Sequence, residues 1–271
     1  MKSLPFLASA LVILLLALAA LSAPLISPHD PERQDLSAGL KGPSPTHLLG
    51  QDKLGRDILS RLLFGARISL WVAVLTVSIS LSVGVFLGLL AGYFGGLVDM
   101  FLMRLIDVLQ SFPGILLAIA FAAVLGPSLT NVVVALSLIG WVGYARLTRG
   151  QILSLREEEF ILAAQASGAS HWRVMFKHML PNILALIIVQ ASFQMAGAII
   201  AESSLSFLGL GTQPPTPSWG SMINEGRPYL LTAPNLTTFP GLAIMVAVLS
   251  FNFLGDGFRD IMDPAKKAKL I

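Results

Sequence analysis

The sequence contains no cysteine and few charged residues. Of its 271 residues, 12% are Asp, Glu, Lys or Arg, whereas a soluble globular domain typically carries about 25%. The absence of cysteine excludes disulfides and cysteine-ligated metals. The shortage of charge indicates that much of the surface faces lipid. The formal net charge of +3 is too small to favour nucleic acid as a partner, and it fits basic loops on the cytoplasmic face of a membrane.

Motifs of common enzymes are missing as well. Without a GxxxxGK[ST] phosphate loop, the chain itself is not expected to bind ATP and Mg²⁺ or to hydrolyse ATP. No HExxH or GxSxG motif occurs either. The four histidines are dispersed along the chain, at His29, His47, His171 and His178. We therefore predict no catalytic residue and no metal site. A remote alternative is an intramembrane enzyme that uses Ser203 and Ser204 beside Glu202, but no predicted span supplies a His or Lys partner.

Long apolar runs dominate the chain, which is 55% hydrophobic. A helix needs about 20 mostly apolar residues to cross a bilayer. Six runs meet this requirement, at residues 4–26, 68–90, 101–125, 129–145, 183–208 and 236–254. Their length and lack of alternation predict helices rather than strands. In the third run, Arg104 and Asp107 are three residues apart and are expected to neutralise one another.

The first run has a second interpretation. Lys2 precedes it, and Leu21-Ser22-Ala23 loosely resembles a cleavage site, so a removable signal peptide is the alternative. The length of the run favours a first transmembrane helix within residues 1–27.

Basic residues predict the orientation. Five Lys or Arg lie in 146–177 and four in 259–269, which places both segments in the cytoplasm. Six others lie in 28–67 and oppose this orientation, but the loop 209–235 contains only Arg227. We therefore predict cytoplasmic termini, an external segment 28–67, a transmembrane domain 68–258 and a cytoplasmic tail 259–271. Within 28–67, apolar residues from Ile58 to Ala66 opposite an Asp57–Arg61 pair predict an amphipathic helix at the outer membrane interface.

The segment 151–182 is the longest polar interruption in the second half of the chain. Phe160, Ala163, Ala164 and Ser167 recur at helical spacing and form a narrow face of small side chains with one aromatic ring. Gly168 is suited to a positive φ that turns the chain after this helix. A second short helix is expected to follow and to end at Pro181. This pattern is typical either of a docking element or of an ordinary connection between spans.

The fifth run carries a polar stripe. Gln190, Gln194 and Gly197 lie on one helix face, and Glu202 falls near the outer edge of the bilayer. Polar residues in spans usually face a water path or the bundle interior, although they also join helices by hydrogen bonds. We predict that these four residues belong to a translocation path.

Several motifs resemble those of a known transporter family. The segment 159–181 resembles the EAA loop of ABC-importer permeases, with matches at Ala163, Ala164, Gly168, Leu180 and Pro181. Leu162 stands where the family has Glu, so no acidic contact is expected there. Gly50-Gln-Asp-Lys-Leu-Gly-Arg-Asp57 is similar to the GTDxxGRD motif of the C-type permease in the dipeptide, oligopeptide and nickel importer branch.

This resemblance implies an all-α, six-helix transmembrane bundle with a cytoplasmic coupling helix, in the inner membrane. It implies a permease subunit that imports dipeptides or oligopeptides, with nickel or another non-peptide solute as the alternative. The implied partners are a second permease, two ATPase subunits that bind ATP and Mg²⁺, and an extracytoplasmic solute-binding protein. The implied ATPase-coupling residues are Phe160, Leu162, Ala163, Ala164, Ser167, Gly168, Ala169 and Pro181. Docking of the binding protein is assigned to Gly50, Asp52, Gly55, Arg56, Asp57 and Trp219.

Overall fold

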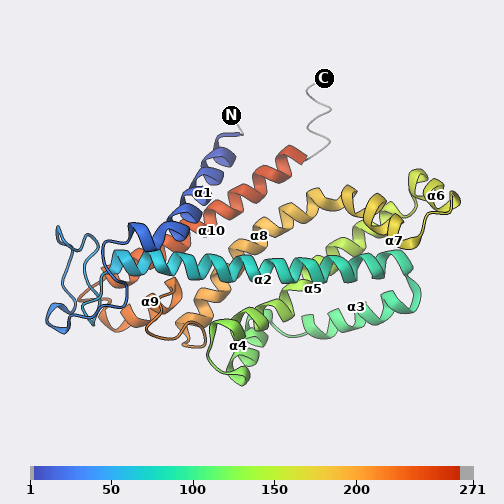
Figure 1. Ribbon diagram of the computed structural model, residues 1–271. Helices are drawn as coiled ribbons and strands as arrows, with labels where there is room; N and C mark the ends of the chain where they lie inside the picture. Colours follow the sequence, from blue (N-terminus) through green and yellow to red (C-terminus); the bar gives the residue numbers. More distant parts are fainter. Residues whose placement is uncertain (1–2, 263–271) are drawn as a thin grey trace.

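The structure is a computed structural model that describes residues 3–262, and these residues form helices and connecting loops without a strand (Figure 1). Five long helices make up the bundle: α1 (Ser3–Ile26), α2 (Ile58–Phe94), α5 (Leu129–Leu155), α8 (Leu180–Phe207) and α10 (Asn235–Met262). Shorter helices connect them: α3 (Gly96–Gln110), α4 (Gly114–Leu125), α6 (Glu159–Ala166), α7 (His171–Arg173) and α9 (Trp219–Gly226). Five helices are long and apolar enough to cross a membrane, or six if α3 and α4 together form one span. The predicted all-α membrane bundle is confirmed.

Helix α2 is longer than its predicted span, and it absorbs the predicted amphipathic helix. It begins at Ile58, where the Asp57 carboxylate accepts a hydrogen bond of 2.8 Å from the Ser60 N–H and so caps the helix. The segment is the start of this long helix and not a helix of its own, and Ser60 and Arg61 on it are buried; its place at the membrane interface stays a prediction. The expected Asp57–Arg61 pair is also absent, since Arg61 pairs with Asp52 and Glu225.

The third predicted span is broken. Helices α3 and α4 meet at an angle of 84°, and Pro113 lies at the break, where its ring and missing N–H prevent a continuous helix. Asp107 pairs with Arg146 of α5 at 2.7 Å rather than with Arg104. Asp99 of α3 pairs with Arg149 of α5 in the same way. Both arginines lie on α5, which runs on to Leu155, beyond its predicted end at residue 145.

The fifth span is also longer than predicted. The helix continues without interruption from His171 to Phe207, so the expected stop at Pro181 is wrong. Residues Val174–Met179 form a π-helical segment, and the Leu180 N–H donates to the Met175 carbonyl five residues earlier. Pro181 then lies in the first turn of α8, where a proline is tolerated.

A row of glycines joins α2 to α5. At Gly88, an added Cβ would lie 2.6 Å from the Ala145 carbonyl oxygen, and at Gly92 it would lie 2.7 Å from Ile152 Cβ. Gly84 continues the row one turn earlier. A small-xxx-small pattern of this kind lets two membrane helices approach closely.

The bundle has two ends, visible at the left and right of Figure 1. We call the end formed by residues 27–57 and 208–234 the loop end, and the end formed by α6 and α7 the α6 end. The first helix and the last pack against one another near the chain termini, where the Phe6 and Phe258 rings are 5.3 Å apart. The predicted tail 259–271 begins inside α10, and residues 263–271 lie outside the described residues.

Candidate functional site

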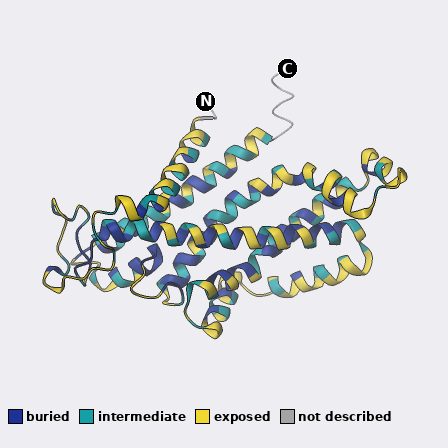
Figure 2. Cartoon of the chain, in the orientation of Figure 1, coloured by how far each residue is buried: buried dark blue, intermediate teal, exposed yellow. Residues whose placement is uncertain are grey.

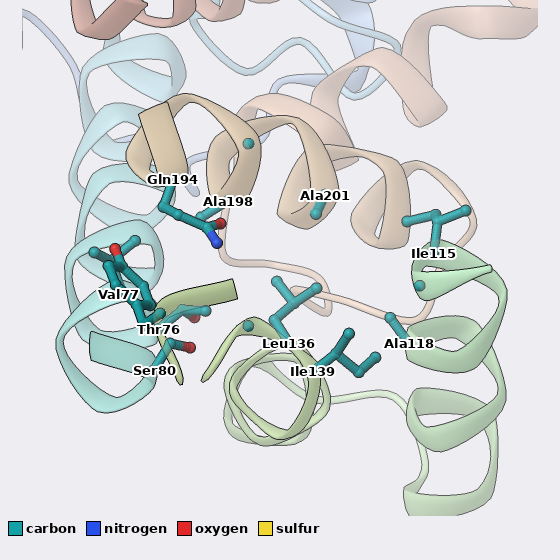
Figure 3. Close-up of a pocket in the computed structure, with 14 residues that line it drawn as sticks. Thr76, Val77, Ser80, Ile115, Ala118, Leu136, Ile139, Gln194, Ala198 and Ala201 are labelled. Carbon is teal, nitrogen blue, oxygen red and sulfur yellow. The ribbon is translucent and has the colours of Figure 1, made fainter. Parts of the chain in front are cut away.

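A cavity of about 190 Å³ lies between α2, α4, α5 and α8 (Figure 3). Its walls combine apolar side chains with a few polar groups. It is lined by Thr76, Val77, Ser80, Gly114, Ile115, Ala118, Leu136, Ile139, Gly140, Tyr144, Gln194, Gly197, Ala198 and Ala201. These residues are neutral, so the cavity offers hydrogen bonds without fixing an ion by charge.

Three hydroxyl groups in the cavity wall are buried and have no hydrogen-bond partner among residues 3–262. They belong to Thr76, Ser80 and Tyr144. Buried polar groups in proteins are nearly always paired, and a water molecule occupies about 30 Å³. The cavity is large enough for several waters or a small solute, and small side-chain rotations would bring these hydroxyls into contact with it. Sequence analysis missed these three residues, although polar side chains inside apolar runs are a usable signal.

Two of the predicted path residues line this cavity. Gln194 and Gly197 contribute from α8, and Gln194 also lines an adjoining groove of about 470 Å³. Gln190 lies nearby, because a Cβ added at Gly143 of α5 would be 3.9 Å from its amide nitrogen. The stripe on α8 therefore faces α5 and the cavity.

Glu202 does not belong to this cavity. Its side chain is fully buried and accepts hydrogen bonds from Ser69 Oγ at 3.0 Å and Ser206 Oγ at 2.8 Å. Ser203 Oγ lies 3.4 Å away. The carboxylate thus joins α8 to α2, and the assignment of Glu202 to the translocation path stays a prediction that this cavity does not support.

The predicted docking residues of the loop end are all inside the protein. Gly50, Asp52, Gly55, Arg56, Asp57 and Trp219 are buried. Arg56 donates to Asp52 at 2.5 Å and to Glu225 of α9. Arg61 completes the cluster, 3.5 Å from Asp52 and 3.4 Å from Glu225. Because buried charges require partners, this cluster holds the loop to α2 and α9 and is not a docking surface.

Trp219, the last of the predicted docking residues, is enclosed by α2 and α9. It is 1% exposed, and its indole N–H donates to the Leu62 carbonyl at 3.1 Å. It packs the start of α9 onto α2.

Two histidines that are dispersed in the sequence meet at the loop end. The His29 and His47 rings stack with their centroids 4.4 Å apart, and Asp57 lies beside both. The sequence-based prediction of no metal site rested on dispersal along the chain, which the structure shows to be a poor guide here.

The α6 end presents an apolar surface. Phe160, Leu162, Ala163 and Ser167 are exposed, whereas Ala164 and Ala169 are half-buried (Figure 2). Ile161 is fully buried and joins the main core with Met175, which holds α6 in place. Gly168 has a φ of +79°, which confirms the predicted positive φ. Pro181 is exposed in the first turn of α8 and is not part of the turn between α6 and α7.

A groove of about 500 Å³ borders this surface. It is lined by Tyr93, Phe94, Arg156, Glu157, Leu162, Gln165, Ala169 and His171. Tyr93 and His171 are joined by a hydrogen bond of 2.9 Å across it. Trp172 is exposed and stacks on Phe176 with ring centroids 5.9 Å apart. Exposed rings beside a polar groove are typical of a contact surface for another protein.

Comparison with known proteins supports a transport assignment. Residues 84–268 match the family described as binding-protein-dependent transport system inner membrane component. Residues 2–43 match the N-terminal TM domain of oligopeptide transport permease C, so the first run is homologous to a transmembrane segment.

Individual relatives of this chain are also transport permeases. The dipeptide transport system permease protein DppC of Alkalihalophilus pseudofirmus is 46% identical over 93% of this chain and 83% of its own length. The glutathione transport system permease protein GsiD of Pectobacterium atrosepticum is 47% identical over 96% of this chain and 87% of its own.

A solved structure shows the same fold. An inward-facing form of the MetNI methionine ABC transporter covers 76% of this chain and 98% of the matched chain, with 18% identity and a TM-score of 0.61. The relatives are transport permeases rather than enzymes, which confirms that no catalysis is to be sought in this chain. The chain belongs to the binding-protein-dependent transport system inner membrane components, the multi-pass permease subunits of ABC importers.

Proposed function

We propose that this permease imports short peptides, that ATPase subunits drive it through α6 and α7, and that it works beside a second permease. A solute-binding protein would deliver the peptide at the loop end. The observation that carries the proposal is the α6 surface. Leu162 is 50% exposed and Phe160 44% on a helix that Ile161 anchors firmly to the core. A fixed apolar surface suits the transmission of force from another protein.

The cavity supplies a second line of support. Thr76, Ser80 and Gln194 offer hydroxyl and amide groups to a solute that carries its own donors and acceptors, as peptide bonds do. The absence of charge from the walls, as far as residues 3–262 define them, suits passage rather than tight retention. Selectivity would then rest largely with the binding protein.

The names of the relatives guide the choice of cargo. One transports dipeptides and the other glutathione, which is itself a peptide. The test is uptake of a labelled dipeptide, glutathione and nickel by cells that lack this chain, with and without a plasmid copy. Peptide uptake should depend on the plasmid. Dependence of nickel uptake alone would reject the peptide cargo and support the non-peptide alternative.

The orientation is part of the same proposal. The α6 end and both termini would face the cytoplasm, and the loop end the outside. The chain has no cysteine, so single cysteines can be placed at the exposed residues Gln34 and Gln165. An impermeant thiol reagent applied to intact cells (with the outer membrane permeabilised) should label Gln34→Cys and spare Gln165→Cys. The opposite labelling would reverse the topology.

A further inference from the structure

We infer that His29, His47 and Asp57 form a binding site for a divalent transition-metal ion of the zinc class at the loop end. Each residue offers one potential ligand atom, a ring nitrogen or a carboxylate oxygen, and these three atoms all lie within 4.8 Å of one another. Imidazole nitrogen and carboxylate oxygen are ligands that zinc and its neighbours prefer. The site does not depend on which solute the permease carries.

The distances to Asp57 Oδ1 suit an ion between the three side chains, and the two rings, which are stacked at 25° to one another, would turn to direct both nitrogens at it. Tetrahedral zinc, with bonds of about 2.0–2.2 Å, separates its ligand atoms by about 3.4 Å. His29 Nδ1 lies 3.8 Å from Asp57 Oδ1, which is close to that separation and too long for a hydrogen bond. His47 Nδ1 lies 2.9 Å from the same oxygen, so the ion would replace this hydrogen bond and release its proton.

His29 supplies an independent sign of a ligand. Its Nδ1 atom is buried and has no hydrogen-bond partner within the described part of the chain. An ion coordinated by this nitrogen would satisfy it. The His29 side chain as a whole is 34% exposed and that of His47 is 21% exposed, so the site lies close to the protein surface.

Asp57 is already oriented for coordination. Its Oδ2 accepts hydrogen bonds from the Ser60 N–H at 2.8 Å and the Ser60 hydroxyl at 2.6 Å. This arrangement leaves Oδ1 directed at the two histidines. Metal sites commonly use such outer hydrogen bonds to fix a ligand. The Ser60 hydroxyl also accepts from the His29 backbone N–H at 3.1 Å, which ties the histidine to the same framework.

The ion would fasten three separate segments. His29 follows α1, His47 lies midway along the connecting loop, and Asp57 caps α2. The site would therefore staple residues 27–57 to the start of α2. Three protein ligands leave a fourth position for water, so we expect an exchangeable ion rather than a closed structural site.

The test is metal titration of the full-length protein purified in detergent and stripped with a chelator. Co²⁺ is followed by its visible absorption and Zn²⁺ by calorimetry. We expect one ion per chain and a tetrahedral Co²⁺ spectrum. His29→Ala and His47→Ala should each weaken binding by more than about 10-fold. His178→Gln, at the opposite end, is the matched control and should bind as the unmodified chain does.

A replacement ligand guards against misfolding. His29→Cys restores a zinc ligand and should bind Zn²⁺ where His29→Ala does not, with a Co²⁺ spectrum shifted by thiolate coordination. If the alanine variants fail to fold, the spectrum of the unmodified chain and of His29→Cys decides the matter. Metal binding no stronger than non-specific binding to surface side chains would overturn the inference. Unchanged binding in His29→Ala and His47→Ala would overturn it as well. Peptide uptake by these variants is scored separately, so loss of the metal site and loss of transport are distinguishable.

Discussion

At the loop end, the side chains of Asp52, Arg56 and Asp57 point into the protein, whereas at the α6 end Phe160 and Leu162 point out of it. Both segments interrupt apolar runs, and both resemble family motifs. The loop-end motif is charged yet buried, and the α6-end motif is largely apolar yet exposed. From polarity alone, one would expect the charged loop-end motif to be exposed and the apolar α6-end motif to be buried.

The two motifs differ because the interaction partners of one lie in this chain, whereas those of the other would lie in another protein. A buried charge is stable only when its partner is in the same folded unit, and Arg56 finds Glu225 within this chain. An exposed apolar surface on a well-held helix has its natural partner in another protein. The loop-end motif therefore maintains this subunit, and the α6-end motif is free to contact a second one.

The strongest test of this comparison is to break the ion cluster. Arg56→Ala leaves the buried Asp52 and the half-buried Glu225 with Arg61 as their remaining cation, and it should lower the free energy of unfolding by about 3 kcal/mol. Denaturation of the purified protein in detergent measures this loss. Lys53→Ala, an exposed neighbour in the same loop, should change stability by less than about 0.5 kcal/mol. Equal effects of the two changes would mean that the cluster contributes little to stability.

A second change probes the close contact between α2 and α5, the helices that run between the two ends. Gly88→Ala places a methyl group against α5 and should destabilise the protein by about 1–3 kcal/mol. Gly150→Ala in α5 meets no atom within 4 Å, and it should stabilise the helix by roughly 0.5–1 kcal/mol. Thermal unfolding of both variants checks the opposite signs. A common sign would contradict the close approach of α2 to α5.

A third change concerns the turn at the α6 end. Gly168→Val forces a branched side chain into a positive φ, which should cost roughly 1–2 kcal/mol. The protein should still reach the membrane, but α6 would be displaced, so ATPase association and peptide uptake should fall sharply. Co-purification of the ATPase and an uptake assay measure the two effects. Normal assembly and wild-type uptake would reduce α6 and α7 to an ordinary connection.

The smallest effect on stability should come from the exposed α6 surface. Ala163→Arg adds a long charged side chain pointing to solvent, so unfolding should shift by less than about 0.5 kcal/mol. It should nevertheless block ATPase contact by its size. Leu162→Ala should be milder, because it only removes apolar area. If Ala163→Arg left co-purification of the ATPase unchanged, the docking surface would have to lie elsewhere on the α6 end.

The sequence predicted the local features and missed those that join distant residues. Apolar runs identified the long helices, and the need for a turn identified the positive φ of Gly168. The burial of Arg56 depends on Glu225, 169 residues away, and no local pattern reveals that pairing. His29 and His47 likewise meet because of the path of a long loop, which no local pattern reveals.

One wrong prediction and one omission had signals in the sequence. Pro113 marked the break between α3 and α4, although the apolar run concealed it. Gly84, Gly88 and Gly92 stand four residues apart, as expected of a close helix contact. Pro181 was misread in the other direction, because the π-helical segment before it lets the helix continue.

Helix α2 spans 37 residues, which corresponds to about 55 Å at the usual rise per residue, well beyond the thickness of a bilayer core. It has no proline along its length, so one continuous helix connects the ion cluster at one end to the groove beside α6 at the other. A displacement delivered at Tyr93 would reach Arg61 with little loss by bending. Any bending would then have to occur in the elements around α2, at the break before α4 and at the π-helical segment before α8.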